Sequence, residues 1–256
     1  MEISVSDLRA IRAVSYREVI RFLRAKSRIV SSIAIPLIWF CAFGLGLGSA
    51  FGVRHGSLEY AEFLAPGIVA MTALFASTLS GISIIVDKEF GIIKELLIAP
   101  VSRFSLVLGK LMGGMITSLL RAILITILFC MILELHVGIL DFLGVLLVIS
   151  LIAIGFGGFA IAIATKMESL EGFGLIVELF VMPIFFLSGA FFPIERLPGW
   201  LSTAVLLNPL TYGVDGLRLL MLGTSSFSML HNLTALIGFD VAVMLLAAYF
   251  FERSGV

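Results

Sequence analysis

The sequence predicts an all-α fold: a polytopic membrane protein with six transmembrane helices, an N-terminal interfacial amphipathic helix and a re-entrant helical hairpin between helices five and six. Two observations predict it. Of the 256 residues, 60% are hydrophobic and only 13% are charged, whereas soluble domains carry about 45–50% apolar and about 25% charged residues. The apolar residues also form long runs, such as LLRAILITILFCMIL, without the apolar–polar alternation of an outer-membrane barrel strand.

Residues 1–28 predict an amphipathic helix that lies on the cytoplasmic surface of the membrane. At 100° per residue, one face carries Leu8, Ile11, Ser15, Val19 and Phe22. The opposite face carries Arg17, Arg21, Arg24 and Arg28. An apolar face in the acyl boundary, with arginines directed toward the phosphates, is typical of interfacial helices. The alternative is a basic segment that sets the topology and has no fixed fold.

Six apolar stretches are each long enough to cross about 30 Å of hydrocarbon as a helix. They are residues 29–47, 64–86, 106–133, 142–164, 173–192 and 233–251. The third is long enough to tilt or to extend past the bilayer on one side.

The Lys and Arg residues predict the orientation of these spans. Seven precede the first span and four lie between spans two and three, while Lys166 and Arg253 follow spans four and six. The other side holds Arg54, Arg196 and Arg218. We therefore expect a multi-pass protein of the cell membrane with both termini in the cytoplasm. Because the 17 basic residues equal the 17 acidic ones, no net charge favours binding to nucleic acid.

The connection after span two, DKEFGIIKELLIAPVSRF (residues 87–104), predicts a short amphipathic helix that Pro100 ends. Such a helix is suited to docking into a groove on a cytoplasmic partner, and a solvated helix end is the alternative. The residues that we single out here are Asp87, Lys88, Glu89, Gly91, Lys94, Glu95 and Pro100.

Between spans five and six, two apolar pieces of residues 201–207 and 212–222 are each too short to cross a bilayer. Asn208-Pro209 separates them, which predicts a re-entrant hairpin in the outer leaflet. Irregular backbone at that depth needs protein or a water-filled cavity around it, so we expect a substrate exit there. The residues that define the hairpin are Pro193, Pro198, Gly199, Asn208, Pro209 and Tyr212.

Three ionisable residues lie inside the spans: Arg121, Glu178 and Asp240. Arg121 and Asp240 fall near mid-depth, where they are able to pair, and Glu178 is nearer the cytoplasmic leaflet. A structural ion pair or a polar patch along a substrate path is favoured over proton or sodium coupling.

The sequence offers no candidate for catalysis or for metal binding. The three histidines have no close-spaced partner ligand, and no phosphate-binding loop is present. If the protein uses ATP, another chain must hydrolyse it. The spacing of Gly109 and Gly113 instead indicates close packing between helices.

Two stretches carry a resemblance to a known family: DKEFGIIKELLIAPVSRFSLVLGK and FLSGAFFPIERLPGWLSTAVLLNPLTYGVDGLR. With the order of the predicted elements, they make residues 20–253 resemble the transmembrane domain of ABC-2 type transporter permeases, in particular the membrane subunits of daunorubicin-resistance-type exporters. The resemblance implies that residues 91–99 form a coupling helix. It also implies that the hairpin caps a central pathway.

The resemblance further implies the assembly. Two permease copies, as a homodimer in the lipid bilayer, bind two copies of a separate ABC ATPase subunit, which holds the ATP and magnesium. This chain binds no cofactor and is not an enzyme. We therefore expect the permease subunit of an exporter of a lipophilic drug, lipid or glycoconjugate. The alternative is an ion-coupled secondary transporter that uses Asp240 or Glu178.

Overall fold

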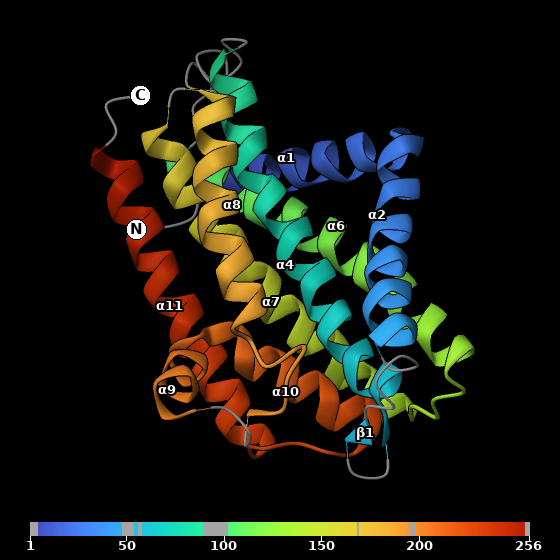
Figure 1. The fold of residues 1–256 in the computed structure, drawn as a ribbon. Coiled ribbons are helices and arrows are strands. Elements are labelled where there is room, and N and C mark those ends of the chain that lie inside the picture. The colour runs from blue at the N-terminus through green and yellow to red at the C-terminus, as the bar shows by residue number, and fades with distance from the viewer. Residues whose placement is uncertain are drawn as a thin grey trace.

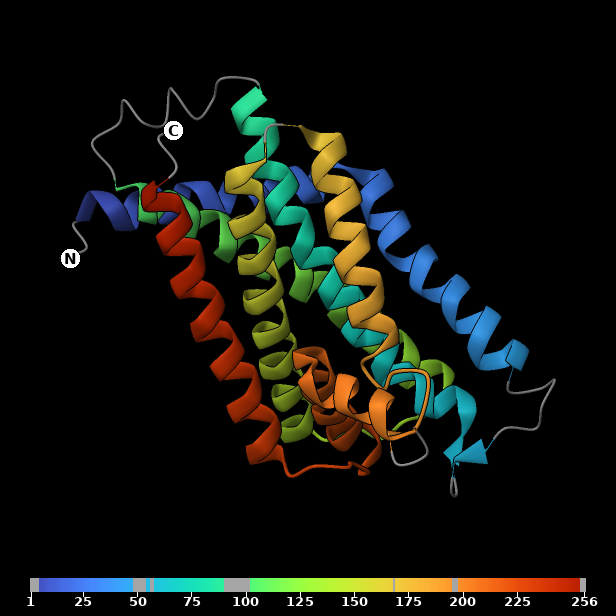
Figure 2. The same cartoon turned by 60° about the vertical axis from the view of Figure 1, so that its left-hand side comes forward.

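The computed structural model describes residues 5–47, 54–55, 58–89, 102–167, 169–194 and 198–253, which fold as a helical bundle (Figures 1 and 2). Its helices are α1 (Val5–Arg24), α2 (Lys26–Trp39), the π-helix η1 (Phe40–Leu47), α4 (Tyr60–Glu89), α6 (Arg103–Ile132), α7 (Ile139–Lys166), α8 (Leu170–Phe186), α9 (Gly199–Leu207), α10 (Pro209–Leu222) and α11 (Met229–Arg253). The two-residue strands β1 (Arg54–His55) and β2 (Leu58–Glu59) pair antiparallel. Apart from this short hairpin, the described residues confirm the predicted all-α fold.

Among the described residues, five helical segments are long and apolar enough to cross a membrane: Lys26–Gly44, Tyr60–Asp87, Ser105–Ile132, Ile139–Lys166 and Met229–Ala247. Residues 173–192 were predicted to form a further span, but α8 ends at Phe186 after 17 residues. At 1.5 Å per residue it is about 26 Å long, less than the roughly 30 Å of a hydrocarbon core. The prediction of six spans is therefore not confirmed.

Helix α4 is the centre of the bundle. Its side chains from Phe63 to Leu74 are almost all buried, and they belong to one apolar core with residues of α6, α7 and α10. Helix α4 is enclosed, whereas the outer helices α2, α8 and α11 expose many apolar side chains, including Val30, Leu179 and Leu245. An apolar core together with an apolar surface is typical of a helix bundle that faces lipid.

Helix α1 lies across the bundle near one end, and α2 leads away from it along the side of the bundle (Figures 1 and 2). Most of its predicted apolar face packs against α6, where Ser15 and Phe22 are buried, whereas Leu8 on the same face is exposed. The predicted close packing at the glycines of α6 is confirmed. A Cβ on Gly109 would lie 2.9 Å from the Cβ of Val14, and one on Gly113 would lie 2.8 Å from the Cβ of Glu18.

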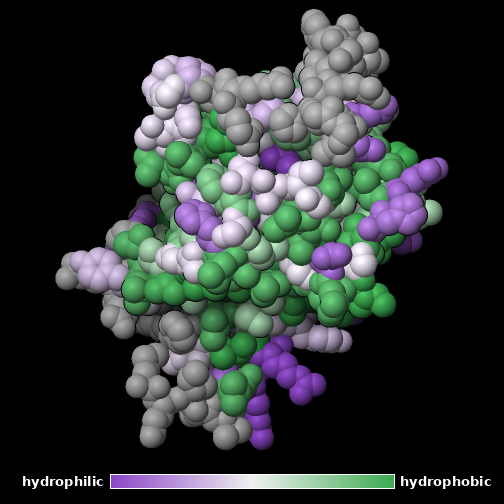
Figure 3. All heavy atoms as spheres, turned by 90° about the horizontal axis from the view of Figure 1, so that it is seen from below, coloured by the Kyte–Doolittle hydropathy of each residue, from purple (hydrophilic) through white to green (hydrophobic). Residues whose placement is uncertain are grey.

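Helices α9 and α10 lie at the opposite end from α1 (Figure 2). They correspond to the two predicted apolar pieces, and Asn208 separates them as expected. Helix α10 is buried along most of its length, from Leu210 to Arg218, among α4, α7 and α11. Figure 3 views this end and shows largely apolar side chains with polar ones scattered between them. The re-entrant depth of the pair remains a prediction.

Asn208 holds this end of the bundle together. Its side-chain amide donates to the carbonyl oxygens of Ile184, at 2.6 Å, and of Leu187, at 2.9 Å. Its Oδ1 accepts from the amide of Leu210, at 3.0 Å, which caps the start of α10. Because those carbonyls lie at the C-terminal end of α8, Asn208 supplies partners where α8 stops. The chain then turns at Gly189, whose φ is +71°, and this explains why α8 is shorter than predicted.

We expect Asn208→Ala to lower the free energy of unfolding by about 2 kcal/mol, because two carbonyls and an amide lose their partner. Asn208→Asp should lower the free energy of unfolding further, because the carboxylate still caps α10 but places an oxygen, in place of the amide nitrogen, against both carbonyls. Thermal unfolding of the purified protein in detergent measures both. Thr203→Ala is the control, because it removes an exposed hydrogen bond from the neighbouring α9. Equal transition temperatures for the Asn208 and Thr203 variants would contradict this role.

Candidate functional site

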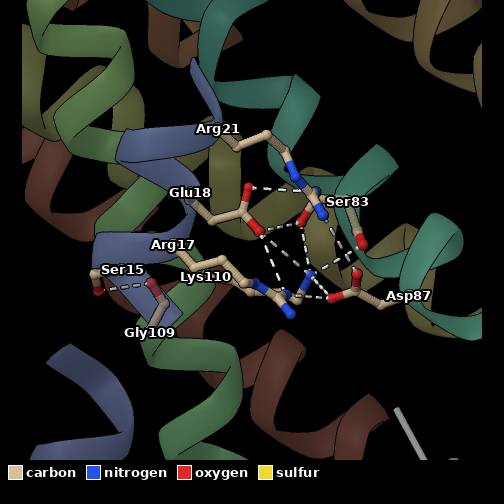
Figure 4. Close-up of polar contacts among 8 residues, drawn as sticks. All are labelled: Ser15, Arg17, Glu18, Arg21, Ser83, Asp87, Gly109 and Lys110. Carbon is tan, nitrogen blue, oxygen red and sulfur yellow. Dashed lines mark hydrogen bonds and ion pairs between the residues drawn. The ribbon is translucent and has the colours of Figure 1, made fainter. Parts of the chain in front are cut away.

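Three helices meet at a cluster of charged side chains beneath α1, which we call the charged cluster (Figure 4). It consists of Arg17, Glu18 and Arg21 from α1, Ser83 and Asp87 from α4, and Lys110 from α6. These residues are far apart in the sequence, and α1 reaches the other two helices because Gly109 and Gly113 let it approach α6 closely.

A buried ion pair lies at the centre of the charged cluster. Lys110 Nζ is 2.5 Å from Asp87 Oδ2, and the two side chains are 5% and 0% exposed. Lys110 also donates to the carbonyl of Ser83, at 2.9 Å, and to its hydroxyl, at 2.7 Å. The three ammonium protons thus each have an acceptor, which is the condition under which a buried pair offsets its loss of hydration.

Arginines from α1 complete the neutralisation of Asp87. Arg17 Nη2 donates to Asp87 Oδ2 at 2.7 Å, and Arg21 Nη2 lies 4.0 Å from Oδ1. Asp87 is in the last turn of α4, where the negative end of the helix dipole disfavours a carboxylate. The carboxylate is therefore stable there only while cations from α1 and α6 are close. This corrects the expectation that Arg17 and Arg21 reach toward lipid phosphates.

Glu18 links α1 to the other side of the same cluster. Ser83 Oγ donates to Glu18 Oε1 at 3.2 Å, and Lys110 Nζ lies 3.8 Å from the same oxygen. Glu18 also pairs with Arg21 on its own helix, at 3.8 Å. Alternating charges from three helices thus form one network, in which each removal leaves a neighbour without its partner.

Asp7 forms a second junction, between α1 and the start of α6. Its Oδ1 accepts from the amide of Ser102 at 2.9 Å and from the hydroxyl of Ser105 at 2.9 Å. Ser102 is the N-cap of α6, and an acidic group is favourable at this positive end of the helix dipole. Asp7 thereby supplies from another helix the anion that stabilises the first turn of α6.

The two junctions bracket the connection in which the coupling helix is predicted. Asp87 lies just before that connection and is bound to Arg17, while Ser102 lies just after it and is bound to Asp7. Helix α1 is therefore hydrogen-bonded to described residues on both sides of this connection, one near the end of α4 and one at the start of α6.

The other residues of the predicted coupling helix are placed only in part. Glu89 is the last residue of α4 and its side chain is exposed. Lys88 belongs to the same turn of α4. Gly91, Lys94, Glu95 and Pro100 lie outside the described residues.

Most of the predicted hairpin residues lie at the ends of α9 and α10. Pro198 is the N-cap of α9 and is exposed, as is Gly199, and Pro209 is the first residue of α10. The Tyr212 hydroxyl donates to the carbonyl of Leu206 at 2.8 Å. Pro193 lines a small cavity of about 70 Å³ together with Phe63 and Arg218.

The three ionisable residues predicted inside the spans are not brought together. Arg121 is stacked over the ring of Phe22, at 4.4 Å from its centroid, and so lies beneath the C-terminal end of α1. Asp240 packs against Gly155 of α7, and Glu178 is exposed on α8. Among the ion pairs of the described residues, none joins Arg121 to Asp240. The expected pair is therefore not formed.

Sequence reasoning missed Asp7, Glu18, Ser83 and Lys110 as members of these junctions. Among the basic residues between spans two and three, Lys110 serves only to predict the topology. Its position one turn inside an apolar run could have indicated a buried ion pair, because an ionisable group there requires a partner. The sequence does not identify Asp87 as that partner, since it does not show how the connection between them folds.

Within the described part of the chain, no three His, Cys, Asp or Glu side chains are grouped so that they would hold a metal ion. The polar contacts described above join helices to one another. They fix the positions of α1, α4 and α6 relative to one another.

Comparison with known proteins agrees with this architecture. Residues 9–222 match the family model of the ABC-2 type transporter. The ycf38 protein of Cyanophora paradoxa, named as a transport permease, is 32% identical over 211 residues, which cover 78% of this chain and 70% of that protein.

Two further relatives are covered over most of their length. The inner membrane transport permease YadH of Escherichia coli K12 is 25% identical over 246 residues, 95% of each chain. Nodulation protein J of Rhizobium leguminosarum bv. trifolii is 28% identical over 234 residues, 90% of this chain and 87% of that protein. The chain belongs to the ABC-2 type transporter family.

Proposed function

We propose that this chain is the membrane-spanning permease subunit of an ABC exporter, and that a separate ATPase subunit holds the ATP and magnesium and supplies the energy. The observation that carries this proposal is that α1 is bonded to both ends of residues 90–101, through Arg17–Asp87 and Asp7–Ser102. When a bound partner displaces this segment, the displacement is passed to α1, α4 and α6 together.

In the proposed mechanism, the ATPase docks on residues 90–101 and beside α1. Closure of the ATPase moves this segment, and the charged cluster passes the displacement to α4 and α6 as one body. Packed cores respond to such displacements by switching between discrete arrangements. The movement of α1, α4 and α6 thereby shifts the exposed helices α2 and α8 relative to the core.

A second permease copy is part of the proposal. Helices α2 and α8 expose large apolar side chains, among them Ile38, Leu175 and Leu179, and α8 makes few contacts with the rest of the bundle. A homodimer that is built on this surface would enclose the pathway between two copies. In that setting α8 serves as the fifth of six spans despite its length, and α9 and α10 cap the outer end.

A lipophilic cargo is supported by the side chains between α2, η1 and α8. Trp39 stacks on Phe43 at 5.3 Å, and the rings of Phe185, Phe186 and Phe191 pack edge-on or tilted around them. Apart from the indole N–H of Trp39, these rings offer no hydrogen-bonding group. They favour a lipophilic drug, a lipid or the lipid part of a glycoconjugate over a free sugar.

A buried carboxylate keeps a second candidate function open. Asp240 is 7% exposed, and its Oδ1 has no hydrogen-bond partner among the described residues. Such a group inside a span is the usual means of coupling transport to an ion gradient. This observation favours an ion-coupled secondary transporter as the alternative.

Docking of the ATPase is tested by charge reversal at the exposed end of α4. Glu89→Lys, or Lys94→Glu in the connection, should abolish co-purification with the ATPase subunit without changing the thermal unfolding temperature. The reason is that Glu89 is exposed and takes part in no contact of the charged cluster. Glu171→Lys, exposed in the first turn of α8, is the control. Full retention of the ATPase by both reversed variants would contradict docking at this segment.

Coupling is tested inside the charged cluster. Asp87→Asn leaves Lys110 and Arg17 without their carboxylate, so we expect a loss of about 3–5 kcal/mol of stability. The double variant Asp87→Leu with Lys110→Met removes both buried charges and should recover most of that stability. It should nevertheless transport poorly, because the link to Arg17 is gone. The readouts are thermal unfolding and ATP-dependent uptake of a lipophilic dye into inside-out vesicles. Wild-type transport by the double variant would contradict the proposal.

The two candidate functions are separated by Asp240→Asn. An ATP-driven permease should keep its transport rate within about two-fold, because the carboxylate lies outside the charged cluster. A proton-coupled transporter should lose transport. The decisive control is the purified chain alone in proteoliposomes with an imposed proton gradient. Uptake there without any ATPase would overturn the ABC mechanism.

A further inference from the structure

The junction between α1 and α2 gathers positive charge. The chain turns at Ala25, whose amide donates to the carbonyl of Phe22 at 3.1 Å. Helix α2 then begins at Lys26 with no side chain capping it and no acidic residue in its first turn. A helix N-terminus is a positive end with unsatisfied amides, yet the residues around this one are also cations: Arg24, Lys26 and Arg28, all exposed.

These cations have no acidic partners in the described part of the chain. The ion pairs between described side chains that involve α1 join Arg17, Arg21 and Lys110 to Glu18 and Asp87, and Arg24, Lys26 and Arg28 take part in none of them. Three like charges around an uncapped helix start repel one another and the dipole of α2. The junction therefore offers a favourable position for an anion that comes from elsewhere.

Arg121 is a second, independent observation at the same place. Its side chain is 8% exposed, and its guanidinium lies 4.4 Å from the centroid of the ring of Phe22, in the last turn of α1 before the junction. Its Nε is buried without a hydrogen-bond partner, and no described carboxylate pairs with it. A buried guanidinium whose only described partner is an aromatic ring is costly. It calls for an anion beside Phe22.

The surroundings indicate which anion this is. An open hollow of about 430 Å³ follows α1 toward the junction and is lined by Arg17, Ile20, Arg21, Arg24 and Ala25. Beyond the junction, the apolar helix α2 exposes Val30, Ile35 and Ile38. A cationic recess that continues into an exposed apolar helix matches a molecule with a phosphate at one end and acyl chains at the other.

We propose that the α1–α2 junction is a binding site for an anionic glycerophospholipid. The phosphate lies at the start of α2 between Arg24, Arg28 and Arg121, and the acyl chains follow α2. Bound there, the lipid neutralises the junction and sets the angle between α1 and the first span. The inference does not depend on the ATPase or on transport, because it concerns binding to the isolated chain.

The experiment titrates the full-length protein in neutral detergent with short-chain phosphatidylglycerol, and separately with phosphatidylcholine and with inorganic phosphate. The readout is the concentration that gives half of the maximal rise in unfolding temperature. The variant is Arg24→Gln with Arg28→Gln. The matched control is Arg9→Gln with Arg12→Gln, which removes two exposed arginines from the other end of α1.

Wild-type protein should be stabilised by phosphatidylglycerol at concentrations at least ten-fold below those needed for phosphatidylcholine, and phosphate alone should have no effect. The junction variant should need about 25-fold more phosphatidylglycerol, that is, about five-fold for each arginine removed. The control should stay within two-fold of wild type. Arg121→Met should unfold no earlier than wild type when lipid is absent, and should gain less from phosphatidylglycerol.

Four results would overturn the proposal. The first is an equal loss of phosphatidylglycerol affinity in the junction and control variants, and the second is equal stabilisation of the wild type by both lipids. The third is stabilisation by phosphate alone, and the fourth is an unchanged response to phosphatidylglycerol in both the junction variant and Arg121→Met. The last result, together with lost ATPase co-purification in the junction variant, would assign the cations to an acidic surface of a protein partner.

Discussion

A carboxylate that is buried at the C-terminal end of a helix is the constraint on which the α1 end of this molecule depends. Asp87 is unfavourable there both because it is fully buried and because it faces the negative end of the α4 dipole. It requires Lys110 from α6 and Arg17 from α1 at the same time. Helix α1 must therefore lie across the bundle, and it does so because two glycines of α6 leave room for it.

The two ends of the bundle are held by different chemistry. At the end where α9 and α10 lie, neutral hydrogen bonds of Asn208 join the end of α8 to the start of α10, and α10 is buried among its neighbours. At the other end, charged groups join α1, α4 and α6. Helices α2 and α11 take part in neither set of bonds, and both expose large apolar side chains, among them Val30 and Leu245. These polar contacts therefore do not tie either helix to the rest of the bundle.

The sequence predicted where the helices lie better than it predicted where they end and which helices they contact. Long apolar runs located the helices, because both a buried helix and a lipid-facing helix require such a run. Asn208-Pro209 predicted the break between α9 and α10, since proline starts a helix and an asparagine before it caps one. The early end of α8 was not predictable, because it depends on the side chain of Asn208, which lies 24 residues from Ile184.

The candidate site was predictable in its location but not in its composition. Residues 87–104 stood out by their charge, and the arginines of α1 stood out by their periodicity. Amphipathic periodicity does not distinguish a face that covers lipid from one that covers another helix, so Arg17 and Arg21 were assigned to phosphates although they bind Asp87. The pairing of Asp7 with Ser102 joins segments 95 residues apart, and no local pattern encodes such a contact.

The central claim is that α1 and the end of α4 move as one body. It is tested most directly by electron paramagnetic resonance distances in the ATPase-bound complex, with native Cys41 and Cys130 replaced. Spin labels at Arg12, which is exposed on α1, and at Val86, which is half-buried near the end of α4, should keep one distance with and without ATP. Labels at Arg12 and at Trp200 on α9 should change their distance. An ATP-dependent change between positions 12 and 86, with none between 12 and 200, would contradict the claim.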